Sequence, residues 1–211
     1  MPRADGGERR VRLILASASP RRRDLLDAAG LDFDVEPSGT EEVFDPALAP
    51  EELAVSLALQ KAAAVAALHA GESALVIGSD TVVAVDLAQG PRVLGKPEDE
   101  SEAREMLRLL SGTRHRVVTG VCVVDAASGE SRSAHERTFV TMRAITSVEV
   151  EAYVASQEWR DKAGGYAIQE NADAFVTRLD EGGFDNVVGL PVELTLELLR
   201  RAGASLPPAS R

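Results

Sequence analysis

The stretch VRLILASASPRRRDLL, residues 11–26, passes from a strand pattern to a helix pattern with only a short turn between them. The apolar run VRLILA predicts a buried strand. Ser19 then stands at a typical helix N-cap position, and Pro20 fits the first helical position, where its missing N–H costs nothing. Gly30 marks the end of that helix. A strand that leads directly into a helix indicates an α/β fold.

Strand and helix patterns continue to alternate along the rest of the chain. The patterns that predict strands cover residues 33–37, 74–86, 93–97, 115–125, 137–145, 164–170 and 174–179, with residues 74–86 forming either a strand pair or one bent strand. Helices are predicted from Pro50 to near Gly71, over residues 100–110, after an N-cap at Ser147, and over residues 191–202. A turn at Ser128 and Gly129 makes its flanking strands antiparallel. Because hairpins and helical crossovers both occur, the sheet is predicted to be mixed.

Size and composition place the chain among ordinary globular proteins. It has 211 residues, 45% hydrophobic and 27% charged, enough to bury a substantial core. We expect a polar tail over residues 1–10, a single domain over residues 11–204 and a loose tail over residues 205–211. No apolar run approaches the roughly 18 residues of a membrane span, and the polar N-terminus is unlike a secretory signal. The single cysteine, Cys122, is predicted to lie in the core; it allows no internal disulfide, which favours the cytoplasm.

The formal net charge of −11 limits the partners that the chain can bind. It argues against a nucleic-acid partner, which would need a basic face. A small anionic ligand would also be repelled unless cations gather locally. Arg21 and Arg22 gather at a helix start, where backbone N–H groups attract an anion and where Ser17 and Ser19 add hydroxyl donors. The cluster is either a solvated basic helix face or one wall of an anion site.

A lysine lies on the apolar face of the helix predicted after Pro50. Lys61 is four residues from both Leu57 and Val65, which belong to the stripe expected to face the core. A lysine in such a place is rarely buried unless it is paired. Its ammonium either reaches the surface at the edge of the stripe or emerges into a polar cleft.

A carboxylate interrupts the apolar run LVIGSDTVV. Burying Asp80 there costs several kcal/mol unless the charge is neutralised or binds a metal, so Asp80 belongs to a capped turn or is a metal or catalytic carboxylate. Lys96, in LGKPED, is a weaker candidate. The three histidines show no metal-ligand spacing, and no GxxxxGK[S/T] phosphate loop is present. Carboxylates for a divalent cation together with arginine and lysine for phosphates indicate phosphoanhydride chemistry.

Several motifs, in order, resemble those of the Maf family of nucleoside triphosphate pyrophosphatases. They are LILASASPRRRDLL, LALQKA, IGSDTVV, LGKPED, MLRLLSGTRHRVVTGVCVV, DKAGGYAIQ and NVVGLP, and they span roughly residues 11–203. The resemblance implies a Maf/ITPase-like fold: an elongated mixed sheet flanked by helices, with two lobes around a cleft. It also implies hydrolysis of a nucleoside triphosphate to the monophosphate and pyrophosphate, a divalent cation (Mg²⁺ or Mn²⁺), and a cytoplasmic homodimer.

The same resemblance assigns roles to individual residues. Asp80 matches the general base and a residue that approaches the metal. Glu42, in GTEE, matches the acidic metal position, with Glu41 as the competing choice. The positions that match phosphate contacts are Ser17, Arg22, Lys61 and Lys96.

Three positions indicate which nucleobase is preferred. Arg21, Thr81 and Gln169 match the dTTP/UTP-preferring subgroup, whereas the 7-methyl-GTP-preferring subgroup has Trp, Gln and Glu there. The Gln169 amide offers a donor and an acceptor, which complement the edge of uracil or thymine. QENADAF and DEGGFDNVVGLP depart from the family's common form near this predicted pocket. The alternatives are the same reaction on 7-methyl-GTP or other non-standard nucleotides, or a non-catalytic nucleotide-binding regulator of cell division and septum formation.

Overall fold

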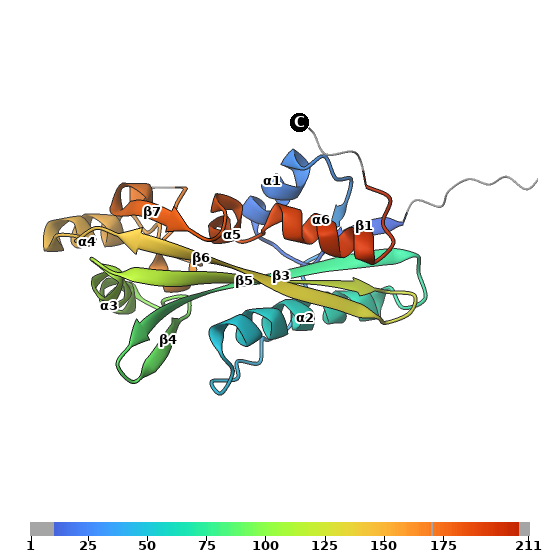
Figure 1. The fold of residues 1–211 in the computed structure, drawn as a ribbon, viewed down its shortest axis with the longest axis horizontal. Helices are drawn as coiled ribbons and strands as arrows, with labels where there is room; N and C mark the ends of the chain where they lie inside the picture. The colour runs from blue at the N-terminus through green and yellow to red at the C-terminus, as the bar shows by residue number, and fades with distance from the viewer. Residues whose placement is uncertain (1–10, 170, 207–211) are drawn as a thin grey trace, which may run out of the picture.

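The computed structural model describes residues 11–169 and 171–206, which form one seven-stranded sheet with helices on both faces (Figure 1). The strands are β1 (Arg12–Leu15), β2 (Asp34–Val35), β3 (Ala74–Leu87), β4 (Gly90–Leu94), β5 (Arg114–Asp125), β6 (Ser131–Met142) and β7 (Val176–Asp180). Their order is β2-β1-β3-β5-β6-β7, and β4 also pairs with β3. β1 pairs in parallel with β2 and β3, and the remaining described pairs are antiparallel. The predicted mixed α/β fold is confirmed.

The central strand β3 changes its neighbour along one edge. Residues 74–87 form one continuous strand of 14 residues, not a strand pair. On one edge β3 pairs with β1 as far as Ile77 and with β4 only from Val83 onward, while β5 covers the other edge throughout this region. Residues 78–82 therefore have no strand partner on the β1/β4 edge. This gap is where a cleft forms between the two ends of the sheet.

The helices divide between the two faces of the sheet. They are α1 (Pro20–Ala28), α2 (Pro50–Leu68), α3 (Glu100–Leu110), α4 (Ser147–Ala155), α5 (Phe184–Val188) and α6 (Val192–Arg201). α2 crosses one face, and α1, α5 and α6 lie over the other (Figure 1). Glycines allow α2 to pack closely, because a Cβ at Gly78 would lie 2.2 Å from the Ala58 carbonyl oxygen and one at Gly120 would lie 2.3 Å from the Ala54 carbonyl.

Apolar side chains form a separate cluster at each end of the sheet. One cluster contains Leu94, Leu107 and Trp159 and joins β4, α3 and the α4 region. The other contains Leu15 and Leu199 and joins β1 with α6. Two further clusters pack α2 against the sheet. Cys122 is buried, as predicted, and burial raises the pKa of its thiol to about 12.

Several local predictions are wrong. The strands predicted over residues 93–97 and 137–145 are displaced, since β4 covers Gly90–Leu94 and β6 covers Ser131–Met142. The N-cap of α4 is Thr146 and not Ser147, because Thr146 and Glu149 form a reciprocal capping box. Residues 164–170 do not form a strand: Gly164 and Gly165 both have φ of 70°, and a 3-10 turn forms at Ala163–Gly165. Helix α5 was not expected. The position of Ser19 as N-cap is confirmed, although its side chain caps no backbone N–H.

The predicted tails are only partly within the described residues. Residues 1–10 and 207–211 lie outside them, and the end of the described chain, after α6, has no helix or strand. No helix in the described ranges has the length and apolar character needed to cross a membrane.

Candidate active site

A cavity opens at the unpaired edge of β3. It encloses about 770 Å³, including the part that is open to solvent. The predicted site residues in its wall are Arg21, Arg22, Lys61, Asp80, Thr81, Lys96 and Gln169. Ser17 and Glu42 join this set through contacts with Arg22 and Lys61. The structure thus brings together side chains from α1, α2, β3 and four connecting segments.

The alternation of β3 distributes its polar side chains to the two faces of the sheet. Successive residues of a strand point to opposite faces. Asp80, like Gly78, faces α2, whereas Ser79 and Thr81 face the side covered by α1 and α5. Because the β3 edge is open here, groups from both faces reach the same cavity.

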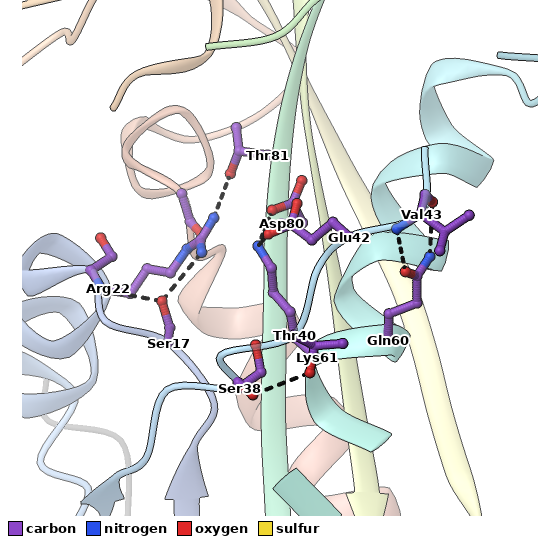
Figure 2. Close-up of polar contacts among 12 residues, drawn as sticks. Ser17, Arg22, Ser38, Thr40, Glu42, Val43, Gln60, Lys61, Asp80 and Thr81 are labelled. Carbon is purple, nitrogen blue, oxygen red and sulfur yellow. Dashed lines mark hydrogen bonds and ion pairs between the residues drawn. The ribbon is translucent and has the colours of Figure 1, made fainter. Parts of the chain in front are cut away.

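Arg22 is held by three hydrogen bonds (Figure 2). Its Nε donates to the Gly189 carbonyl oxygen at 2.8 Å, Nη1 to the Ser17 hydroxyl at 3.3 Å and Nη2 to the Thr81 hydroxyl at 3.2 Å. Burial lowers the pKa of this guanidinium, while Asp80 acts in the opposite direction. An arginine stays charged in spite of such a shift. Arg22 therefore presents a fixed positive charge to the cavity, as expected for an anion site.

The loop after α5 supports Arg22 from behind. The Gly189 carbonyl also accepts a hydrogen bond from Ser79 Oγ at 2.9 Å. Thr81 Oγ1 lies 2.9 Å from Thr119 Oγ1, which donates to the Asn186 carbonyl at 2.8 Å. Sequence reasoning missed these supports, although NVVGLP was noted as a motif. Its glycine is required, since Gly189 has φ of 123° and a Cβ would lie 3.3 Å from Arg22 Nε.

Lys61 pairs with both predicted metal-binding carboxylates (Figure 2). Its ammonium contacts Asp80 Oδ1 and lies 3.0 Å from Glu42 Oε1. The side chains of Lys61 and Asp80 are only 11% and 13% exposed, and that of Glu42 is 39% exposed. Lys61 therefore emerges into a polar cleft, and Asp80 lies within a strand and not in a capped turn. Of the two acidic candidates, Glu42 is the one whose carboxylate reaches this pair.

The carboxylate pair fits a hard divalent cation. In the described ranges, no group of three or more His, Cys, Asp or Glu side chains is arranged to hold a metal ion. Glu42 and Asp80 nevertheless bring two carboxylates to one ammonium. Mg²⁺ is commonly held by one or two carboxylates, with water and substrate phosphate oxygens completing its shell. The donor set at this point is of that kind.

Residues 161–169 build another part of the cavity wall, and only those from Gly164 onward were wrongly predicted as a strand. Asp161, Lys162 and Tyr166 lie in its wall beside apolar groups such as Val117 and Ile168. Sequence reasoning named none of them as site residues. The motif DKAGGYAIQ contained the first three, but the predicted strand began only at Gly164, and nothing in the pattern indicated that Lys162 would be buried.

A buried histidine stands behind this wall. His115 Nε2 lies 2.8 Å from the Tyr166 hydroxyl, and the two rings meet edge to face. Burial lowers the pKa of His115 to about 4 and raises that of Tyr166. Both groups are therefore neutral near pH 7. His115 supports the cavity wall through Tyr166.

Fold and cavity together define the class of this protein. It is a mixed α/β protein with a cleft at an open strand edge, where fixed cations face a pair of carboxylates. Such a site suits a ligand that carries several phosphates.

The chain belongs to the Maf-like protein family. The family model matches residues 12–202. A dTTP/UTP pyrophosphatase of Pelotomaculum thermopropionicum is 48% identical over 191 residues, covering 90% of this chain and 96% of the relative. Proteins with the same name from Bacillus cereus and Bacillus mycoides are each 43% identical; the alignments cover 92% of both chains for the first, and 90% of this chain and 95% of the relative for the second. The family predicted from the motifs is confirmed.

Proposed function

We propose that this chain hydrolyses dTTP and UTP to the monophosphate and pyrophosphate. The names of the relatives support this reaction. The observation that carries the proposal is the meeting of Arg22 with the Lys61–Asp80–Glu42 cluster in one cavity. Cations alone would suit any anion, but a carboxylate pair beside them suits a divalent cation with its phosphate ligand.

Each charged group has a defined task in this reaction. Asp80 orients a water molecule and takes its proton as the water attacks the α-phosphorus. The bond from that phosphorus to the α–β bridging oxygen breaks, and the oxygen leaves with pyrophosphate. Arg22, Lys61 and Lys96 offset the charge that develops on the leaving group. A Mg²⁺ or Mn²⁺ ion held by Glu42 and Asp80 would neutralise further phosphate charge.

The proposed preference for pyrimidine bases is supported by three residues of the cavity wall. Arg21, Thr81 and Gln169 all lie in that wall. The Gln169 amide offers one donor and one acceptor to a uracil or thymine edge. A mismatched base would leave a polar group unpaired, at a cost of about 1–3 kcal/mol. Thr81 contributes indirectly as well, because its hydroxyl contacts Arg22.

Pyrophosphate release from a nucleotide panel tests the proposal. The panel contains dTTP, UTP, CTP, GTP and 7-methyl-GTP, each with Mg²⁺, with Mn²⁺ and with a chelator. We expect release from dTTP and UTP, loss of release with the chelator, and a decrease of about 100-fold or more in Asp80→Asn. Release from another base alone would keep the reaction and overturn the base assignment. Nucleotide binding with no release at all would favour the regulatory alternative.

We further propose that the protein acts in the cytoplasm as a homodimer, as the family resemblance implies. The single cysteine, Cys122, is buried and unpaired, which is compatible with a reducing compartment. Sedimentation of the full chain at micromolar concentration tests the dimer. A monomer at all accessible concentrations would contradict it.

A further inference from the structure

The segment that carries Glu42 has little apolar burial of its own. Residues 36–49 connect β2 to α2 without a helix or strand. Next to Glu42, the side chains of Val43 and Phe44 are 70% and 53% exposed. Leu48, near the end of the segment, packs against the core, but this packing does not extend to Val43 and Phe44. Polar contacts must therefore fix the position of Glu42.

One side-chain amide makes these contacts (Figure 2). Gln60 Oε1 accepts a hydrogen bond from the Val43 N–H at 2.9 Å, and Gln60 Nε2 donates to the Val43 carbonyl at 3.1 Å. The amide thus binds both backbone groups of one residue, as a neighbouring strand would. Nε2 also donates to the Ser56 hydroxyl at 3.3 Å, one turn earlier on α2.

The contacts of α2 with this segment come in adjacent pairs. Gln60 and Lys61 are consecutive on the helix, and Val43 and Glu42 are consecutive on the segment. Gln60 binds the Val43 backbone while Lys61 binds the Glu42 carboxylate. Within the described residues, these two side chains supply the hydrogen bonds and ion pairs that join residues 38–47 to other elements.

We propose that Gln60 is a positioning residue that holds the Glu42 carboxylate beside Asp80, where both can bind a divalent cation. The inference rests on the proposed function, which needs that cation. Lys61 alone cannot fix the position of the Glu42 carboxylate, since its side chain is flexible and its ammonium also pairs with Asp80. The paired amide bonds fix the backbone on the C-terminal side of Glu42 and so limit where its carboxylate can reach.

The test is the binding of Mn²⁺ to the full chain, followed by electron paramagnetic resonance of the free ion. The loss of two neutral hydrogen bonds in Gln60→Ala should weaken binding about tenfold. Alanine is the best helix former, so α2 should stay intact. Ser56→Ala is the matched control: it removes the third bond of Gln60 and keeps both bonds to Val43, and it should change affinity less than twofold. Hydrogen exchange without metal should rise in residues 38–47 of Gln60→Ala only.

A double-variant cycle shows whether Gln60→Ala acts through the position of the Glu42 carboxylate or through a general loss of structure. In the Glu42→Gln background the carboxylate is gone, so adding Gln60→Ala should have no further effect on Mn²⁺ affinity. In turnover assays, Gln60→Ala should raise the Mn²⁺ concentration for half-maximal rate about tenfold and lower the rate at saturating Mn²⁺ less than threefold. Glu42→Gln should also lower the saturated rate.

Three results would overturn the inference. The first is an unchanged Mn²⁺ affinity in Gln60→Ala. The second is that Gln60→Ala lowers Mn²⁺ affinity equally in the wild-type and Glu42→Gln backgrounds. The third is a wild-type chain that does not bind Mn²⁺. Failure of the proposed function has a different signature. A wild-type chain that follows the expected Mn²⁺ pattern but releases no pyrophosphate from any nucleotide would contradict the reaction and leave the role of Gln60 intact.

Discussion

Replacing Lys61 with methionine tests whether the Asp80 and Glu42 carboxylates are buried enough to need the Lys61 ammonium for the stability of the fold. Methionine keeps most of the side chain's length and apolar surface, so little packing is lost along α2. The change leaves Asp80, only 13% exposed, beside Glu42 without the ammonium that both contact. Removing one partner of a fully buried ion pair costs about 3–5 kcal/mol. Because Glu42 is 39% exposed and the cavity is open to water, we expect a smaller loss of about 2–3 kcal/mol.

The assays are urea unfolding, which gives the free energy of unfolding, and thermal unfolding, which gives Tm, both of the metal-free protein at pH 7.5. A loss of about 2–3 kcal/mol corresponds to a decrease of roughly 5–10 °C in Tm for a chain of this size. The double variant Lys61→Met/Asp80→Asn removes the more deeply buried of the two unpaired charges and should recover most of the loss. Arg12→Met is the matched control, since it removes a surface ion pair with Asp34 and should leave stability nearly unchanged.

Equal stability of Lys61→Met and the wild-type chain would refute this reasoning. It would mean that the cluster is fully hydrated and that its carboxylates need no cation. The same result would also remove the physical reason for Lys61 to lie on the apolar face of α2.

Three further changes address the supports, the pH dependence and the base. Gly189→Ala places a Cβ against Arg22 at a φ of 123°, so we expect a loss of roughly 1–3 kcal/mol in unfolding experiments and a raised KM for the nucleotide; wild-type values for both would contradict the role of this loop. Burial gives His115 a pKa of about 4 in the folded chain, against 6.5 when unfolded. Its neutral form therefore contributes fully to stability above pH 6.5, and as much as roughly 3 kcal/mol of the free energy of unfolding is lost as the pH falls toward 4. His115→Gln should make the free energy of unfolding depend less on pH between 6.5 and 4, and an unchanged pH dependence would be inconsistent with a neutral buried imidazole. Gln169→Glu should shift kcat/KM from UTP toward GTP about tenfold or more, and an unaltered ratio would remove Gln169 from the base pocket.

The sequence predicted those parts of the fold that depend on local pattern. The strand–turn–helix at residues 11–30 and the helix after Pro50 depend on periodicity, proline and glycine, and both are confirmed. The wall around Tyr166 was misread, because its apolar residues resemble a strand while two consecutive glycines with positive φ break the extended backbone. These glycines pack closely against Val83 and Pro97, and such long-range contacts leave no periodic signal in the sequence.

The candidate site was predictable as a set of residues but not as an arrangement. From the pattern, the Lys61 ammonium could either reach the surface or emerge into a polar cleft. The structure shows the second, because Asp80 on the neighbouring strand β3 pairs with it. The supports are harder to predict. Gln60, Thr119 and Gly189 act through backbone groups distant in sequence, and such contacts follow from how helices, strands and loops pack together and not from a motif.

The most direct test of the central claim is dTTP hydrolysis in ¹⁸O-labelled water with Mg²⁺, followed by mass spectrometry of both products. If water activated at Asp80 attacks the α-phosphorus, the label enters dTMP and the released pyrophosphate remains unlabelled. Asp80→Asn should form both products at least about 100 times more slowly. Label in pyrophosphate or in inorganic phosphate, or turnover that is unaffected by Asp80→Asn, would contradict the account.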